Sequence, residues 1–155
     1  MTDEPLPLAA DEPLPLATDE PPQPPSAERL RWAVVRTRLD SAIGHEQGRT
    51  RRALVVSAEP FHRALLATVL PITASRSEPR YPAEVAIGIG EAGQTKAGVI
   101  LCHQVRTVSL DRLTGATPDG YVSSPAIRAA VRTALAHHLG LDIPAIADGA
   151  RLVRR

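Results

Sequence analysis

The sequence of 155 residues is poor in cysteine, aromatic residues, lysine and long apolar runs. Its single cysteine, Cys102, excludes an internal disulfide framework and any metal site built from several cysteines. Cys102 lies in an apolar run, so we expect a buried, inert thiol. No stretch approaches the roughly 20 apolar residues that a membrane span needs. The first residues are acids and prolines, which is wrong for a secretory signal. We therefore expect a cytoplasmic protein that makes no membrane contact.

The charges are divided unevenly along the chain. Residues 1–28 hold seven acidic side chains and no lysine or arginine, whereas residues 29–155 hold all 18 basic side chains and ten acidic ones. The net charge of +1 therefore combines a segment near −7 with a body near +8. A cationic domain attracts polyanions, and 17 of its 18 cations are arginines, which bind phosphate in a bidentate way and can stack on bases. A coding bias toward arginine explains the same composition equally well, so the charge alone does not decide for nucleic acid.

Proline and repetition set the first segment apart from the rest. The string DEPLPLA occurs at residues 3–9 and again at 11–17, and more prolines follow. Proline removes a backbone donor and fixes φ, and like charges repel, so we expect residues 1–28 to be a disordered acidic tail. We expect residues 29–141 to form one folded domain and residues 142–155 to form a basic C-terminal tail.

Short aliphatic and β-branched runs in the body indicate strands. Glycine, proline and charged stretches separate these runs and no helix intervenes, which favours a small barrel over a parallel sheet. We predict strands at residues 33–39, 53–57, 66–73, 83–89 and 98–108.

One helix is predicted near the end of the chain. Ser124 is a good N-cap, Pro125 suits the first helical position, and Gly140 stands where a C-terminal glycine belongs. Apolar residues recur every fourth position between them, at Ile127, Val131, Leu135 and Leu139. This stripe must cover one end of the barrel or a partner chain. The predicted fold class is mainly β with a C-terminal helix.

Polar side chains stand near the ends of three predicted strands, in residues 44–57, 65–73 and 99–107. A barrel presents its functional groups at such strand ends and loops. Each segment alone also has a plain structural explanation, because a polar loop is common in a hairpin and threonine is a β-former. The polar residues are Glu46, Gln47, Arg52, Thr73, Gln104 and Arg106.

The order and spacing of these segments resemble the MazF/PemK/Kid family of toxins. The similar stretches are GHEQGRTRRALVVS (44–57), VLPIT (69–73), YPAEV (81–85), VILCHQVRT (99–107) and the predicted helix with its caps (124–141). No single motif is diagnostic, but five in the family's order make coincidence a poor explanation. The resemblance covers about residues 31–141. It implies a small SH3-like barrel of the CcdB/PemK type that pairs into a homodimer.

The resemblance also implies an activity. The family cleaves single-stranded mRNA at selected sequences through the ribose 2′-hydroxyl, without a metal or another cofactor, and a cognate antitoxin neutralises it. The family's catalytic arginine and threonine fall on Arg52 and Thr73. Its loop residues fall on Glu46 and Gln47, near the scissile phosphate and the RNA bases.

These residue types suit that reaction. Attack by the 2′-hydroxyl puts extra negative charge on the phosphoryl oxygens, which a fixed guanidinium and a hydroxyl stabilise without a metal. Loss of Arg52 is expected to cost about 2.7–4 kcal/mol of barrier, or more. Arginine stays protonated and is a poor base, so Glu46 is the candidate base. Arg51 is the competing arginine, because only the alignment separates the two neighbours.

The RNA-binding residues predicted beside this pair are Gln47, His103, Gln104 and Arg106. His103 stands where the family tends to have an acid, so we expect an unusual recognition sequence. His103 and His45 also suggest a two-histidine acid–base mechanism, although the family works without histidines. We expect no metal site, since His137 and His138 are adjacent on a helix and cannot face one ion.

Two other interpretations stay open. The chain could be a non-catalytic relative that binds RNA or a protein such as DNA gyrase, or an unrelated small barrel. The acidic tail could serve solubility or cover the cationic RNA groove.

Overall fold

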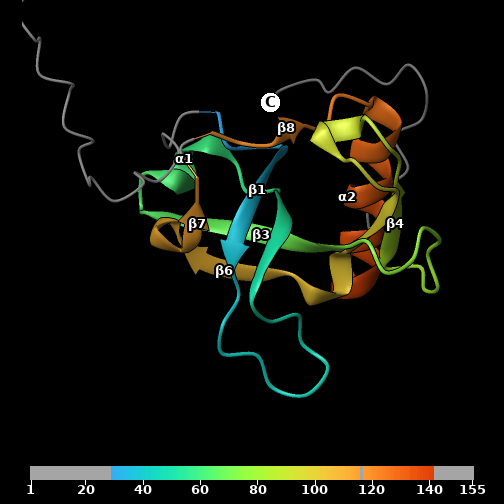
Figure 1. The fold of residues 1–155 in the computed structure, drawn as a ribbon, viewed down its shortest axis with the longest axis horizontal. Helices are drawn as coiled ribbons and strands as arrows, with labels where there is room; N and C mark the ends of the chain where they lie inside the picture. The colour runs from blue at the N-terminus through green and yellow to red at the C-terminus, as the bar shows by residue number, and fades with distance from the viewer. Residues whose placement is uncertain (1–28, 116, 142–155) are drawn as a thin grey trace, which may run out of the picture.

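Eight strands and one long helix form the framework of the chain in the computed structural model, which describes residues 29–115 and 117–141 (Figure 1). The predicted mainly β fold with a C-terminal helix is confirmed. Both predicted tails, 1–28 and 142–155, lie outside the described residues. The strands are β1 (Ala33–Arg38), β2 (Thr50–Val55), β3 (Leu66–Thr73), β4 (Glu84–Ile87), β5 (Gly98–Leu101), β6 (Arg106–Ser109), β7 (Leu113–Thr114) and β8 (Gly120–Tyr121).

The strands form one antiparallel sheet that curves around its core. Their order is β4-β5-β3-β2-β1-β7, with β6 paired to β3 and β8 paired to β1. β3 has the predicted bounds, whereas β2 begins three residues before the predicted residue 53. The short strands β7 and β8 both pair with β1.

The predicted strand 98–108 is wrong in its middle, where a 3₁₀ turn (Cys102–Gln104) separates β5 from β6. Both strands pair with the same edge of β3: Ile100 lies opposite Ile72, and Arg106 lies opposite Val69. The six residue steps from Ile100 to Arg106 therefore lie opposite only three steps of β3, from Val69 to Ile72. The turn accommodates the three extra residues. Such bulges redirect side chains away from the sheet.

Alternation along the strands sorts the core into two clusters. One contains Val34, Leu54, Leu70, Ile72 and Ile100 and is covered by the helix α2 (Pro125–Leu139). The other lies on the opposite side of β1, β2 and β3 and contains Val35, Ala53, Val55, Val69 and Val108. Because successive strand residues face opposite sides, each cluster fixes the direction of the polar residues that follow it.

The helix begins and ends at the predicted caps. Ser124 Oγ accepts the backbone N–H of Ile127 at 3.3 Å, and Gly140 adopts the left-handed conformation with φ of 65°. Ile127, Val131 and Leu135 pack against the first cluster, so the apolar stripe covers one end of the barrel. Leu139 departs from the expected stripe, because 55% of its surface is exposed.

The remaining elements are short and were not predicted. They are α1 (Glu59–His62) and the 3₁₀ turns η1 (Glu91–Gly93) and η3 (Leu110–Arg112). Within the described ranges, no helix has the length and apolar character to span a membrane. Cys102 is fully buried, and burial together with the charge of Glu84 raises the pKa of its thiol to about 12. The expected burial of this thiol is confirmed, and its raised pKa agrees with the expectation of an inert group.

Candidate active site

A cavity of about 540 Å³ opens between the β1–β2 loop and the turn that separates β5 from β6. We call it the loop cavity. Five of the seven predicted site residues line it, although they come from two distant segments of the sequence: Glu46, Gln47, His103, Gln104 and Arg106. The bulge between β5 and β6 explains this gathering, because it turns His103 and Gln104 out of the sheet toward the loop.

Hydrogen bonds tie the loop to the barrel at this cavity. The backbone N–H of Gln47 donates to Oε1 of Gln104 at 2.8 Å. Arg106 Nη1 donates to the carbonyl of Leu39, at the end of β1, at 3.0 Å. The carboxylate of Glu46 is exposed and accepts a backbone N–H of its own loop at 3.1 Å. The loop is thus fixed at Gln47, while Glu46 keeps its second oxygen for other partners.

A buried carboxylate, Glu84, stands next to His103. Arg76 donates to its two oxygens at 2.8 and 2.5 Å, and the backbone N–H of Arg80 donates at 2.7 Å. The Arg76 hydrogen bonds lower the pKa of Glu84, against the opposing effect of burial. Nδ1 of His103 lies 4.0 Å from Glu84, and the His103 ring meets Tyr81 edge-on at 6.1 Å. Nδ1 is buried and has no hydrogen-bond partner among the described residues.

Thr73 ends β3 close to the loop cavity. Its hydroxyl shares a hydrogen bond of 2.8 Å with Ser75 Oγ, and only 8% of the residue is exposed. Pro71 lines the loop cavity, whereas Ile72 and Ala74 line a different one. Since the strand alternates, Thr73 faces the side of Pro71 and the loop cavity.

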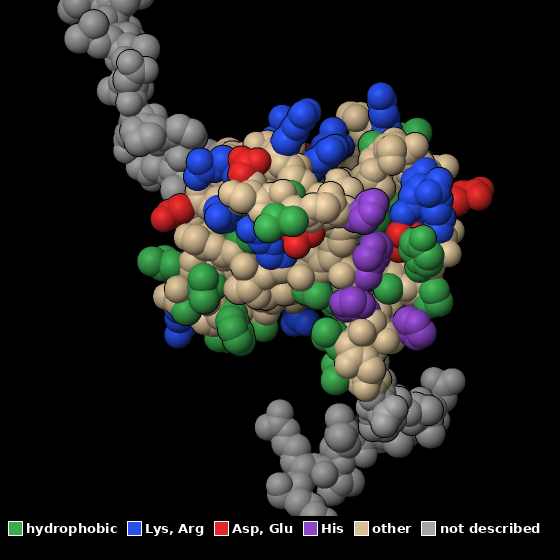
Figure 2. Space-filling model, turned by 90° about the horizontal axis from the view of Figure 1, so that it is seen from below, with side chains coloured by type: hydrophobic (Ala, Val, Ile, Leu, Met, Phe, Trp, Pro, Cys, Tyr) green, Lys and Arg blue, Asp and Glu red, His purple; other side chains and the backbone are tan. Residues whose placement is uncertain are grey.

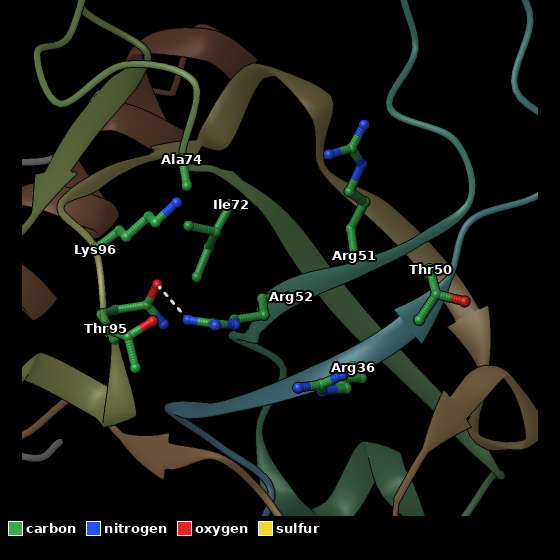
Figure 3. Close-up of a pocket in the computed structure, with 9 residues that line it drawn as sticks. Arg36, Thr50, Arg51, Arg52, Ile72, Ala74, Thr95 and Lys96 are labelled. Carbon is green, nitrogen blue, oxygen red and sulfur yellow. Dashed lines mark hydrogen bonds between the residues drawn. The ribbon is translucent and has the colours of Figure 1, made fainter.

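Arg52 belongs to that different cavity, which has a volume of about 360 Å³ and which we call the strand cavity. Arg52 Nη1 donates to Gln94 Oε1 at 3.3 Å, which is the dashed line in Figure 3. The Nε of Arg52 lies 3.5 Å from Asp119 Oδ2. Its neighbour Ala53 pairs with Pro71 and faces the opposite side of the sheet. The structure therefore does not bring Arg52 together with Glu46 and Thr73.

Arg51 also borders the strand cavity, but its side chain points the other way. Its Nε donates to the carbonyl of Gly48 at 3.3 Å, and in Figure 3 its guanidinium turns away from Arg36 and Arg52, toward the β1–β2 loop. Alternation from Ala53 places Arg51 on the side of the sheet that Thr73 also faces. The arginine that the sequence left as a competitor thus shares a side of the sheet with Thr73. Strand parity was the signal that could have found it, because positions 51, 53, 71 and 73 share a side.

The face seen in Figure 2 carries gathered histidine side chains beside groups of lysine and arginine. His137 and His138 are exposed on α2, and His62 is fully buried elsewhere, between Ser57 and Glu59. In residues 29–115 and 117–141, no group of three or more histidine, cysteine or acidic side chains could hold a metal ion. Metal-free chemistry stays a prediction.

A family model described as "PemK-like, MazF-like toxin of type II toxin-antitoxin system" matches residues 30–139. The chain belongs to this family. The family membership predicted from the five ordered motifs is confirmed.

Individual PemK/MazF-like proteins agree with this assignment. Endoribonuclease PemK of Escherichia coli is 36% identical over 73 residues, which are 46% of this chain and 54% of that protein. The chain therefore spans about half the length of the curated relative that it matches. The predicted endoribonuclease activity agrees with that relative's name.

Two solved structures confirm the predicted PemK-type barrel. An endoribonuclease in complex with its cognate antitoxin, from a Mycobacterial species, is 26% identical with a TM-score of 0.58, covering 74% of this chain and 97% of that one. MazF (Form-I) from Deinococcus radiodurans is 27% identical with a TM-score of 0.57, covering 72% and 96%.

Proposed function

We propose that this PemK/MazF-like chain is a sequence-selective endoribonuclease that cleaves single-stranded mRNA in the cytoplasm and so inhibits translation and growth. We also propose that it acts as a homodimer and that a cognate antitoxin neutralises it. Family membership and the relatives' names support the activity. The observation that carries it in this chain is the loop cavity, which gathers five polar side chains beside the end of β3.

The proposed reaction is an internal transfer at phosphorus. The carboxylate of Glu46 takes the proton of the ribose 2′-hydroxyl, and the freed oxygen bonds to the adjacent phosphorus. The bond from phosphorus to the 5′-oxygen then breaks. That oxygen takes a proton and leaves as a 5′-hydroxyl, while the other fragment ends in a cyclic phosphate. No water and no redox partner is consumed.

For the charge that develops on the phosphoryl oxygens, we assign Thr73 and Arg51. A preorganised donor at such a position is worth more than one that must first move. Arg51 and Thr73 face the same side of the sheet, next to the loop that carries Glu46. Arg52, the arginine selected by the alignment, faces the strand cavity and is assigned a different role below.

We assign base recognition to the side chains of the turn and the loop. The Oε1 of Gln104 is already engaged by the backbone of Gln47, so its amide nitrogen is left to donate to a base. His103 presents a ring whose Nδ1 lacks a partner among the described residues. Arg106 supplies a cation for a neighbouring phosphate. We also assign to His103 the proton that the departing 5′-oxygen takes, which is the role that one histidine has in the two-histidine alternative.

The test is incubation of the purified chain with one long RNA in EDTA, followed by mapping of the 5′-ends. We expect discrete cuts at a common short sequence, persistence of the cuts in EDTA, and their loss in Thr73→Ala. RNA that stays intact but is bound would support the non-catalytic relative instead. Cuts that EDTA abolishes would contradict the metal-free mechanism and leave the nuclease assignment in place.

A further inference from the structure

The strand cavity is a second polar site, and among the residues that line it only Arg51 is assigned to the proposed cleavage. We propose that it binds a backbone phosphate of the RNA, other than the phosphate that is cut. The inference rests on the proposed RNA substrate, but it is argued from residues that the proposed cleavage does not use. The residues of the strand cavity that would bind the phosphate are Arg36, Arg52, Gln94 and Lys96.

The first argument is the placement of like charges. Arg36 and Arg52 lie directly opposite each other on β1 and β2. Like charges in such a cross-strand pair destabilise the sheet. Lys96, the chain's single lysine, borders the same cavity, and Figure 3 shows its side chain extending toward the space that Arg52 also faces. Arg51 also borders the cavity, which makes four cations. Like charges around one cavity are costly for the free protein and become favourable when an anion occupies it.

The second argument is an unpartnered donor. Gln94 is only 4% exposed, and its Oε1 accepts a hydrogen bond from Arg52. Arginine can only donate, so the amide atom that faces Arg52 must be the oxygen. The amide nitrogen, Nε2, is then left without a partner among the described residues. A buried donor without an acceptor costs free energy, and a phosphate oxygen in the cavity that Gln94 lines would satisfy it.

The third argument is that the backbone holds this arrangement in place. Asp119, which pairs with Arg52, is positioned where the β7–β8 connection meets η1. A Cβ atom on Gly93 would lie 2.3 Å from the carbonyl oxygen of Asp119, and one on Gly120 would lie 2.6 Å from a backbone carbon of Ala92. This close contact of two backbone segments fixes the carboxylate that orients Arg52. With one carboxylate against four cations, the cavity keeps a net positive charge for a phosphodiester.

The phosphate in the strand cavity is not the one that is cut. Arg51 and Arg52 both border the strand cavity, but they are adjacent on β2, so their side chains leave the strand on opposite sides. One guanidinium therefore cannot replace the other at the same phosphate. An RNA strand that crosses the end of β2 would place one phosphate on the Thr73 side and another in the strand cavity.

The test measures binding without cleavage. The probe is a short fluorescent oligoribonucleotide with 2′-O-methyl groups, which lacks the attacking hydroxyl. Its dissociation constant is measured by fluorescence anisotropy between about 50 and 200 mM salt. The variants are Arg36→Gln, Lys96→Gln and Gln94→Leu. The matched control is Arg63→Gln, which removes the same charge at the end of α1, outside both cavities.

We expect Arg36→Gln and Lys96→Gln each to weaken binding about tenfold at low salt. Each should also reduce the slope of log affinity against log salt by about 0.7. Gln94→Leu should weaken binding and leave the slope unchanged, since it removes no charge. Arg36→Gln should unfold at the same or a higher temperature than the wild-type chain, because it relieves the pair with Arg52.

Slopes and affinities equal to those of Arg63→Gln would overturn the inference. A second arm offers a peptide of residues 1–28 as the ligand. If the substitutions weaken peptide binding but leave the RNA slope unchanged, the cavity takes an acidic peptide and the RNA assignment is wrong. Failure of the proposed function can be told apart from failure of this inference. If the wild-type chain binds a long RNA but never cuts it, the nuclease assignment is wrong, and the salt slopes still test the phosphate site.

Discussion

Replacing Arg51 and Arg52 one at a time separates two adjacent residues that the sequence alone cannot tell apart. Arg51→Ala removes a guanidinium that faces the Thr73 side and is held by one hydrogen bond to the Gly48 carbonyl. Arg52→Ala removes a guanidinium held by Gln94 and Asp119 in the strand cavity. Both change the net charge equally, so each is the other's control.

The expected magnitudes differ because, in the proposed mechanism, only Arg51 meets the charge that develops in the transition state. Loss of a preorganised donor to such charge costs about 2.7–4 kcal/mol, or a factor of about 10²–10³ in rate. We expect this loss in the rate constant of Arg51→Ala at saturating enzyme. Arg52→Ala should lose less than about tenfold in that constant and show its effect in RNA affinity. Arg51→Lys should recover part of the rate, since it restores the charge without the bidentate geometry.

The assay is single-turnover cleavage of an end-labelled RNA that contains one mapped site, at several enzyme concentrations. This design separates binding from the chemical step. Arg51 is exposed and its substitution should change stability by no more than about 0.5 kcal/mol, which urea unfolding can verify. The reasoning fails if Arg52→Ala shows the large loss at saturation while Arg51→Ala cleaves at nearly the wild-type rate.

Three further predictions concern stability, each measured by urea unfolding. The pKa of Glu84 is lowered in the folded chain, so its ionisation stabilises the fold above the unfolded pKa of about 4.3. This stabilisation is lost as the pH falls through the lower folded pKa. Glu84→Gln should therefore flatten the dependence of stability on pH in this acidic range, and an unchanged profile would refute the prediction. Glu59→Ala should lower the free energy of unfolding by about 1–3 kcal/mol, because it removes the acceptor of three backbone N–H groups and the partner of buried His62. An unchanged free energy of unfolding would show that water replaces these hydrogen bonds. Ser124→Ala should lower the free energy of unfolding by about 1 kcal/mol through loss of the α2 N-cap. Ser123→Ala is the control, because Ser123 is adjacent but is not the N-cap, and this substitution should cost less.

Elements whose ends carry their own local signals could be predicted from the sequence. Every residue of β3 is apolar or β-branched, and the strand has the predicted bounds. α2 was found from Ser124, Pro125 and Gly140, since caps act through the backbone of the helix itself. The residue types of the loop cavity were also found, because Glu46, Gln47, His103, Gln104 and Arg106 lie in motifs that could be matched in order.

Features that depend on strand pairing could not be predicted. The turn Cys102–Gln104 lies inside an apolar run, and only the register against β3 reveals three surplus residues. The choice between Arg51 and Arg52 likewise depends on which side of β2 faces which cluster. A shift of one residue reverses every side chain of a strand, so an alignment that is uncertain by one position cannot assign a side.

The bulge between β5 and β6 separates the strand pairs that hold the barrel together from the turn to which we assign RNA recognition. β3 pairs independently with each flanking strand, through Ile72 and Ile100 on one side of the turn and Val69 and Arg106 on the other. Neither set of pairs depends on the number of residues in the turn between them. Under the proposed function, insertions, deletions or substitutions around His103 can therefore change which RNA sequence is read while the sheet keeps its register. A nuclease of the proposed kind can acquire a new target sequence without first losing its fold.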